Sequence, residues 1–390
     1  MKHINQFLGS AFALMVSASS YACNLTAQES KNTTLTTSTV AEKPAKQYVK
    51  IALLLDTSNS MDGLINQAKA QLWDIVNEFT HAKCGNDSRP LLQIALYEYG
   101  NDNLSAREGY IRQVLGFSDD LDEISEKLFS LTTNGGEEYC GEVIHTSLKQ
   151  LEWGKNADDL KMIFIAGNEP FDQGEFNYQY ATTNAKEKDV IVNTIFCGNY
   201  EQGINTHWKN GAILTGGDYM AIDHNRQVVH IATPYDDIII QLNAKLNNTY
   251  VSYGSAGYAK KELQAVQDAN AAELEEAVVV KRAVSKSSRL YKNSQWDLVD
   301  AVEDDEAVLS KLEDKDLPSE LKGKSKKEIS EYISLKKEER EKIQKQIQEL
   351  NSKREVYIAE HQKEEAGQLE NAMLSAIKAQ ASKKNYKWDN

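Results

Sequence analysis

The sequence predicts an α/β fold: a doubly wound, mostly parallel sheet with one antiparallel edge strand, followed by an α-helical C-terminal extension. Two features of the 390-residue chain support this prediction. From 47 to 254, short apolar runs alternate with helical patterns, which is typical of βαβ units whose helices cover both faces of a sheet. Beyond Gly257 the chain becomes rich in Ala, Lys, Glu and Gln, which are good helix formers.

The first half of the alternating region contains a predicted hairpin. Tyr48–Leu55 is a continuous apolar run, as expected of a buried strand. Two further strand-like segments, Leu92–Tyr99 and Tyr110–Phe117, are joined by a polar turn that contains Gly and Asn, so we expect an antiparallel pair at the edge of the sheet. Apolar residues at helical spacing predict helices at 64–79, 121–131 and 143–153.

The second half continues the alternation. The predicted strand Leu160–Ala166 is followed by Gly-Asn-Glu-Pro170, and proline there ends the strand. Further strands are expected at 190–196, 219–223 and 228–232, and helices around 180–185, at 236–247, over 260–305 and over most of 324–381. The last segment lacks a sustained apolar repeat, because Arg354 and His361 occupy positions where apolar residues should follow. A long solvated helix or weak helical hairpin is therefore expected rather than a stable coiled coil.

The composition divides the chain into five expected segments. These are a signal peptide (1–22), a disordered tether (23–46), the α/β domain (47–254), a helical region (255–317) and a long, charged, coiled-coil-like helical region (318–390). The tether is rich in Thr, Ser and Ala and has little large apolar content, a composition that does not build a core.

The N-terminal residues resemble a secretory leader. A weakly basic start precedes a short apolar stretch, and Ser20 and Ala22 lie at the −3 and −1 positions before Cys23. Cys23 at the new N-terminus suggests a bacterial lipoprotein, with simple signal-peptidase cleavage as the alternative. We expect a protein of the bacterial periplasm or cell surface, whose membrane contact is through an N-terminal lipid alone.

The charge of the chain excludes one class of partner. The formal net charge is −14, whereas a nucleic-acid binder needs a basic face. We therefore expect no nucleic-acid partner.

The most informative motif lies where the first predicted strand ends. Asp56, Ser58 and Ser60 follow the apolar run at alternate positions. In open α/β folds, ligands bind at the carboxyl ends of the strands. A carboxylate and two hydroxyls are hard oxygen donors, which suit Mg²⁺, Mn²⁺ or Ca²⁺ better than zinc. The same residues could instead cap the following helix.

The pattern Asp56-x-Ser58-x-Ser60, with its preceding strand and following helix, resembles the metal-ion-dependent adhesion site of von Willebrand factor A (VWA) domains. The resemblance extends over about 50–254 and implies a Rossmann-like VWA fold. In that family a second loop contributes a hydroxyl and a later strand end contributes an Asp.

Carried over to this chain, the resemblance implies that Thr133 or Thr132 supplies the hydroxyl. Glu137 and Glu138 stand where a family Thr is common, and Asn168, with Glu169 beside it, replaces the Asp. The implied metal ligands are Asp56, Ser58, Ser60, Thr133, Glu138 and Asn168.

The resemblance also implies a function. Family members bind a partner protein by letting an acidic side chain of the partner complete the metal shell, and Glu138 could close that open position. We expect a metal-dependent adhesion or assembly module without catalysis. The alternative is a structural scaffold, in which the C-terminal helices mediate assembly and the VWA domain is a rigid, metal-free spacer.

The cysteines and histidines add two expectations. The chain has Cys84, Cys140 and Cys197 besides Cys23. If one disulfide forms, we expect Cys140–Cys197, because both are predicted at the same sheet edge. No H-E-x-x-H or G-x-S-x-G motif occurs, so no enzymatic activity is expected.

Overall fold

The computed structural model describes residues 46–59, 61–85, 87–222, 230–361 and 368–388. The predicted signal peptide, the tether up to residue 45, the lipidation site Cys23 and the motif residue Ser60 lie outside the described residues.

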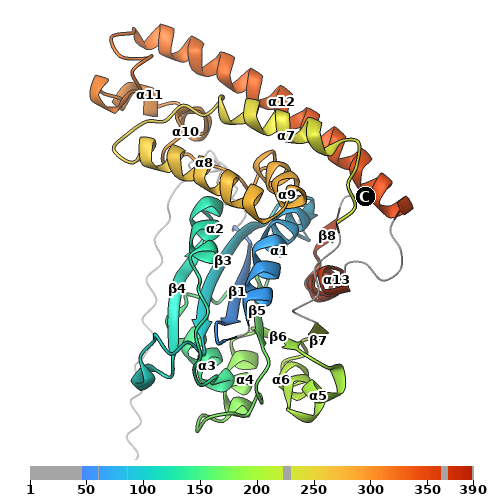
Figure 1. Cartoon of the computed structure of the whole chain (residues 1–390). Helices are drawn as coiled ribbons and strands as arrows, with labels where there is room; N and C mark the ends of the chain where they lie inside the picture. The colour runs from blue at the N-terminus through green and yellow to red at the C-terminus, as the bar shows by residue number, and fades with distance from the viewer. Residues whose placement is uncertain (1–45, 60, 86, 223–229, 362–367, 389–390) are drawn as a thin grey trace, which may run out of the picture. The chain divides into compact units, whose positions relative to one another are not determined.

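A six-stranded sheet forms the centre of the structure. Its strand order is β4-β3-β1-β5-β6-β7, and Figure 1 shows these strands side by side in that order. The bounds are β1 Tyr48–Asp56, β3 Leu91–Tyr99, β4 Ile111–Ser118, β5 Leu160–Gly167, β6 Ile191–Cys197 and β7 Tyr219–Ile222. All neighbouring pairs are parallel except β3 and β4, which are antiparallel at one edge. The predicted fold class is therefore confirmed.

The strand β1 is buried on both faces, because helices cover both sides of the sheet. Its alternate residues enter two different cores: Leu53 and Leu55 belong to one, and Ala52 and Leu54 to the other. The first core includes helices α1 Asp62–Thr80 and α2 Leu121–Phe129. The second includes α3 Cys140–Gln150, α4 Tyr178–Glu187 and α6 Trp208–Ile213, with the short α5 Tyr200–Asn205 beside α6.

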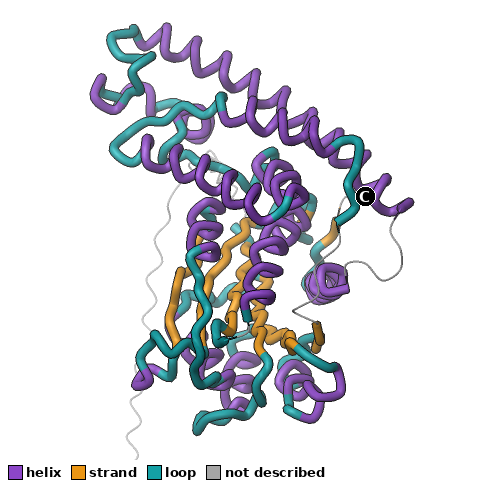
Figure 2. Tube along the Cα trace, viewed as in Figure 1, coloured by secondary structure: helices purple, strands orange, loops and turns teal. Residues whose placement is uncertain are grey.

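The remaining helices follow the sheet. They are α7 Asp236–Asn247, α8 Gly257–Leu274, α9 Glu276–Lys286, α10 Leu298–Asp304, α11 Val308–Lys311, α12 Lys326–His361 and α13 Gln368–Ser382. The long α12 lies beside α7 (Figure 2). No helix within the described ranges is long and apolar enough to cross a membrane.

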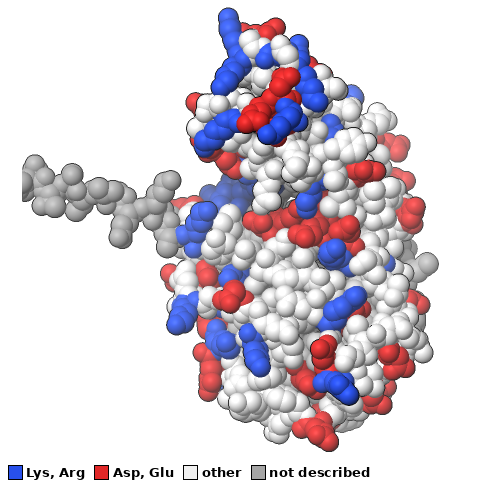
Figure 3. Space-filling model, turned by 90° about the vertical axis from the view of Figure 1, so that its left-hand side faces the viewer, with Lys and Arg blue, Asp and Glu red and all other residues white. Residues whose placement is uncertain are grey.

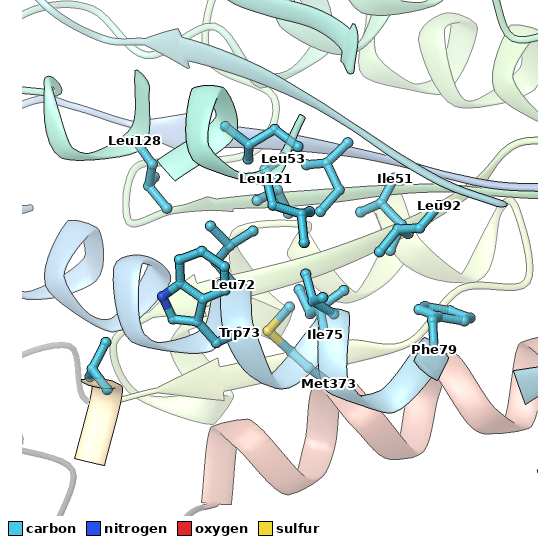
Figure 4. Packing of buried hydrophobic residues seen from close by; sticks show 14 of the residues in the cluster. Ile51, Leu53, Leu72, Trp73, Ile75, Phe79, Leu92, Leu121, Leu128 and Met373 are labelled. Atoms are coloured by element: carbon cyan, nitrogen blue, oxygen red, sulfur yellow. The ribbon is translucent and has the colours of Figure 1, made fainter. Parts of the chain in front are cut away.

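Several of these C-terminal helices complete the first core, whereas α10 and the start of α12 share a smaller apolar cluster of their own. Val278 and Val280 of α9 and Ile377 of α13 belong to the same apolar cluster as Leu53 and Leu72. Figure 4 shows Met373 of α13 reaching into this cluster beside Ile75. Lys46–Asn390 accordingly form one compact unit.

Three local expectations were wrong. Residues 230–232 of the predicted strand 228–232 are not strand, and the rest of that segment is outside the described residues. The predicted helix over 260–305 is broken at Glu275 and again from 287 to 297. The long helix α12 is not solvated on all sides, because Ile333, Ile343 and Ile347 are buried on one of its faces. The sequence analysis also missed a small antiparallel pair, β2 Ala82–Lys83 with β8 Lys387–Trp388.

Candidate metal centre

Asp56 lies at the carboxyl end of the central strand β1 and is fully buried. Its Oδ1 accepts a hydrogen bond from the Ser58 backbone N–H at 2.7 Å. Its Oδ2 is buried without a hydrogen-bond partner. Because β1 lies between β3 and β5, the loops that follow both neighbouring strands meet at this carboxylate.

Glu138 reaches the same point from the loop that precedes α3. A Cβ placed on Gly100 would lie 2.7 Å from Glu138 Cγ and 3.0 Å from Asp56 Oδ1, so the two carboxylate side chains converge above this glycine. Glu138 is 4% exposed, and its Oε2 is also buried without a partner. The predicted ligand Glu138 is therefore brought to Asp56.

Backbone hydrogen bonds hold the Glu138 loop against its neighbours. Asn134 N–H donates to Thr57 O at 3.0 Å, and Asp102 N–H donates to Gly135 O at 2.6 Å. A Cβ on Gly136 would lie 2.6 Å from Gly100 O. The close approach of these two loops therefore requires glycine at 136, which is what the Gly-Gly pair of the sequence supplies.

Asn168 supplies a third oxygen from the end of β5. Its Oδ1 is buried without a partner. The adjacent Gly167 lies close to the centre, since a Cβ there would be 3.2 Å from Asp56 Oδ2. Glu169 is exposed, and its charge contributes to raising the pKa of Asp56 and Glu138.

The other predicted ligands are placed differently. Ser58 is buried beside Asp56. The Thr133 hydroxyl donates to Asp62 Oδ1 at 2.6 Å in an exposed position, so it is engaged with the first turn of α1. Ser60 lies outside the described residues.

The electrostatics of the centre favour a bound cation. Burial raises the pKa of Asp56, and burial together with the Asp56 charge raises the pKa of Glu138 to about 9. Buried oxygens without partners are costly. A hard divalent cation would satisfy the converging carboxyl groups of Asp56 and Glu138, and Asn168 offers an amide oxygen at the end of the neighbouring strand, so the residues present fit such an ion. Within the described residues no group of three His, Cys, Asp or Glu could hold a metal, so an ion here would depend on amide and hydroxyl oxygens as well.

The predicted disulfide Cys140–Cys197 is wrong. Both thiols are free and buried, as is that of Cys84. Cys140 belongs to the core under α3, whereas Cys197 belongs to the core on the other face of the sheet. The Cys140 Sγ lies 3.7 Å from the Tyr99 hydroxyl, and burial raises the pKa of this thiol well above its usual range.

Residues at the end of β3, which were not predicted as part of the site, also contribute to it. The Tyr99 hydroxyl donates to Ala166 O at 2.9 Å, which links β3 to β5 beneath the carboxylates. Asn101 Nδ2 donates to Thr132 O at 2.9 Å and to Thr57 O at 3.3 Å. A signal was present, because Gly100-Asn101-Asp102 directly follows a strand that neighbours β1.

Comparison with known families identifies the fold around this centre. A family model described as the von Willebrand factor type A domain matches residues 50–206. The chain contains a VWA domain. Such domains often mediate metal-dependent protein interactions. No curated protein matched the chain.

Several solved structures are similar at low identity. Proximal thread matrix protein 1 from the mussel byssus, with a zinc-occupied MIDAS motif, is 15% identical, has a TM-score of 0.35, and is matched over 46% of this chain and 43% of that chain. The pilus adhesin SpaC of Lactobacillus rhamnosus is 12% identical with a TM-score of 0.34, over 46% and 28%. An aerotolerance-related membrane protein of Bacteroides fragilis is 15% identical with a TM-score of 0.32, over 45% and 92%. The match spans less than half the length of the mussel and Lactobacillus proteins.

Proposed function

We propose that this protein is a metal-dependent protein-binding module that acts without catalysis. The observation that supports the proposal is the convergence of the Asp56 and Glu138 carboxyl groups, each with a buried, unpartnered oxygen. Asn168, which directly follows Gly167 at the end of β5, adds a third buried, unpartnered oxygen. When both carboxyl groups are ionised, each of these oxygens is an acceptor, and a cation is a ligand that satisfies acceptors alone.

The cation that suits this site is Mg²⁺, with Mn²⁺ or Ca²⁺ as close alternatives. Carboxylate, amide and hydroxyl oxygens are the donors that hard cations prefer. In this proposal Asp56, Ser58, Glu138 and Asn168 hold the ion. The bound ion would neutralise the paired carboxylates and fix the loops that present the surface to a partner.

The absence of catalysis and the location belong to the proposal. The Cys140 thiol is buried, and its Sγ lies 3.7 Å from the Tyr99 hydroxyl, which favours a thiol that packs rather than reacts. The leader-like residues before Cys23 support a place in the bacterial envelope, anchored by lipid if Cys23 is modified.

The test is calorimetric titration of the purified protein with Mg²⁺ and with Mn²⁺. Wild type should bind one ion, Asp56→Ala should lose binding, and Glu138→Gln should weaken it by about ten-fold or more because a charged ligand is lost. Glu137→Gln is the matched control, because this exposed neighbour in the same loop should leave the affinity unchanged. Binding by Asp56→Ala equal to wild type would refute the proposed centre.

A pull-down from envelope extract tests the protein-binding part. Capture of a partner by wild type should disappear with EDTA and with Asp56→Ala, and should persist with Glu349→Gln, which changes an exposed residue of α12. Capture that is indifferent to EDTA would favour the scaffold alternative.

A further inference from the structure

The loops around the candidate metal centre carry an unusual charge balance. We define the rim as three loops, 100–110, 132–139 and 168–177. Its exposed carboxylates are those of Asp102, Glu108, Glu137, Glu169, Asp172 and Glu175. The rim contains a single basic residue, Arg107. The whole chain has 58 acidic and 44 basic residues, so the excess of negative charge at the rim is far larger than the average.

One face of the molecule carries charges of both signs. Lys and Arg lie among Asp and Glu over the face drawn in Figure 3. Six carboxylates with one arginine leave about five negative charges on the rim, and a divalent cation bound by ionised Asp56 and Glu138 would not change that value. The rim field therefore attracts positive charge whether or not the centre is loaded.

Contacts between the loops make the rim one continuous surface. Asp102 N–H donates to Gly135 O at 2.6 Å, and Gln173 Nε2 donates to Glu137 Oε2 at 2.9 Å. A Cβ on Gly174 would lie 2.6 Å from the Tyr139 ring. The acidic side chains are thus held on loops that brace one another.

An unpartnered acceptor on the rim gives a second indication. The half-buried rim residue Gln173 has a buried Oε1 without a partner, and the proposed cation does not use this atom. A ligand that complements it must bring a hydrogen-bond donor.

An aromatic pair lies within the same surface. The rings of Tyr110 and Tyr139 are 6.3 Å apart between centroids, and both residues are half-buried. Aromatic faces next to carboxylates are suited to guanidinium and ammonium groups, which bind through cation–π contacts and ion pairs at once.

We propose that the rim binds an Arg- and Lys-rich segment of a partner protein. This inference rests on the proposed function and specifies its partner. It departs from the carboxylate-bearing partner that the family resemblance implies, because Glu138 already brings a carboxylate to the centre and the rim repels another.

Two peptides serve as probes of this proposal: a fluorescent twelve-residue peptide with six arginines separated by Gly and Ser, and its counterpart with glutamates in place of arginines. Fluorescence anisotropy is measured with the full chain in Mg²⁺. The rim variant carries Glu137→Gln, Asp172→Asn and Glu175→Gln. The matched control carries Glu338→Gln, Glu341→Gln and Glu349→Gln on α12, where these side chains are exposed. Both variants change the net charge by the same amount.

The rim variant should weaken binding of the arginine peptide by about ten-fold, and the α12 variant by less than about two-fold. Equal losses in both variants would show non-specific attraction to an acidic protein and overturn the proposal. Preferential binding of the glutamate peptide would overturn it in favour of the family mode. Calorimetry with Mg²⁺ on the same samples separates the two proposals: if the metal does not bind but the rim variant still loses the peptide, the proposed metal function fails and the basic-partner inference survives.

Discussion

The metal edge of the sheet and the helical side of the molecule both bury charge, but they do so in opposite ways. At the metal edge, Asp56 and Glu138 are buried with one oxygen each left without a partner. On the helical side, Arg282 of α9 donates to Asp122 at 2.8 Å and to Asp268 at 2.6 Å, and Lys286 donates to Asp268 at 2.8 Å.

The helical side extends this pairing to α12. Arg340 donates to Asp297 and to Asp300, each at 2.7 Å, and its guanidinium lies 4.1 Å from the Tyr250 ring centroid. Arg354 donates to Asp236 at 2.9 Å. Opposite charges compensate one another there, whereas two carboxyl groups with raised pKa values face one another at the metal edge. Compensated burial is the mark of structure, and uncompensated burial is the mark of a site that awaits a ligand.

The largest expected effect comes from breaking the compensated side. Arg282→Ala would leave Asp122 and Asp268 buried with too little positive charge, and we expect a loss of about 3–5 kcal/mol in the free energy of unfolding. Urea denaturation measures it. The control Lys327→Ala removes an exposed partner of Glu331 on α12, and should cost less than about 0.5 kcal/mol. Similar losses in both variants would show that the buried network is no more important than a surface pair.

The same network should make the free energy of unfolding depend on pH in the acidic range. Burial alone would raise the pKa of Asp268, but Lys286 and Arg282 outweigh it and hold the pKa below its usual range. The folded state then binds fewer protons than the unfolded state, so this stabilisation is complete above about pH 4 and is lost as the pH falls further. Asp268→Asn should be much less stable than wild type at pH 7, and the difference should narrow between pH 4 and pH 2. A constant difference across that interval would contradict the assignment.

The comparison also explains which features the sequence revealed. The strand β1 and its terminal Asp56 were predictable, because a buried strand and the polar residue that ends it are adjacent in sequence. The arrival of Glu138 at Asp56 depends on the close approach of Gly136 to Gly100. This non-local contact sets the path of the loop, and so determines that Glu138 rather than Glu137 reaches Asp56.

Two predictions, for Arg354 and for the disulfide, were wrong because they depend on contacts between residues that are far apart in sequence. Arg354 was interpreted as an interruption of the apolar repeat, yet it is buried against Asp236, 118 positions away, and no local pattern shows such a partner. The prediction of a Cys140–Cys197 disulfide relied only on both residues lying at the same edge of the sheet. Ile195 and Cys197 lie in one core and Phe196 in the other, so strand alternation would have placed Cys197 on the face away from α3.

The smallest expected effect is a gain in stability, which we expect from a substitution at the metal edge. Asp56→Asn keeps an oxygen for the Ser58 N–H but removes a buried charge that lacks compensation, so in EDTA we expect the variant to be more stable than wild type by about 1–2 kcal/mol. Saturating Mg²⁺, at about 100 times its dissociation constant, should stabilise wild type by about 2.7 kcal/mol and the variant by little. Thermal and urea unfolding measure the stability of wild type and of Asp56→Asn, each in EDTA and in Mg²⁺. A variant destabilised in EDTA would mean that Asp56 is a structural cap whose charge the fold needs, and the contrast between the two buried regions would then disappear.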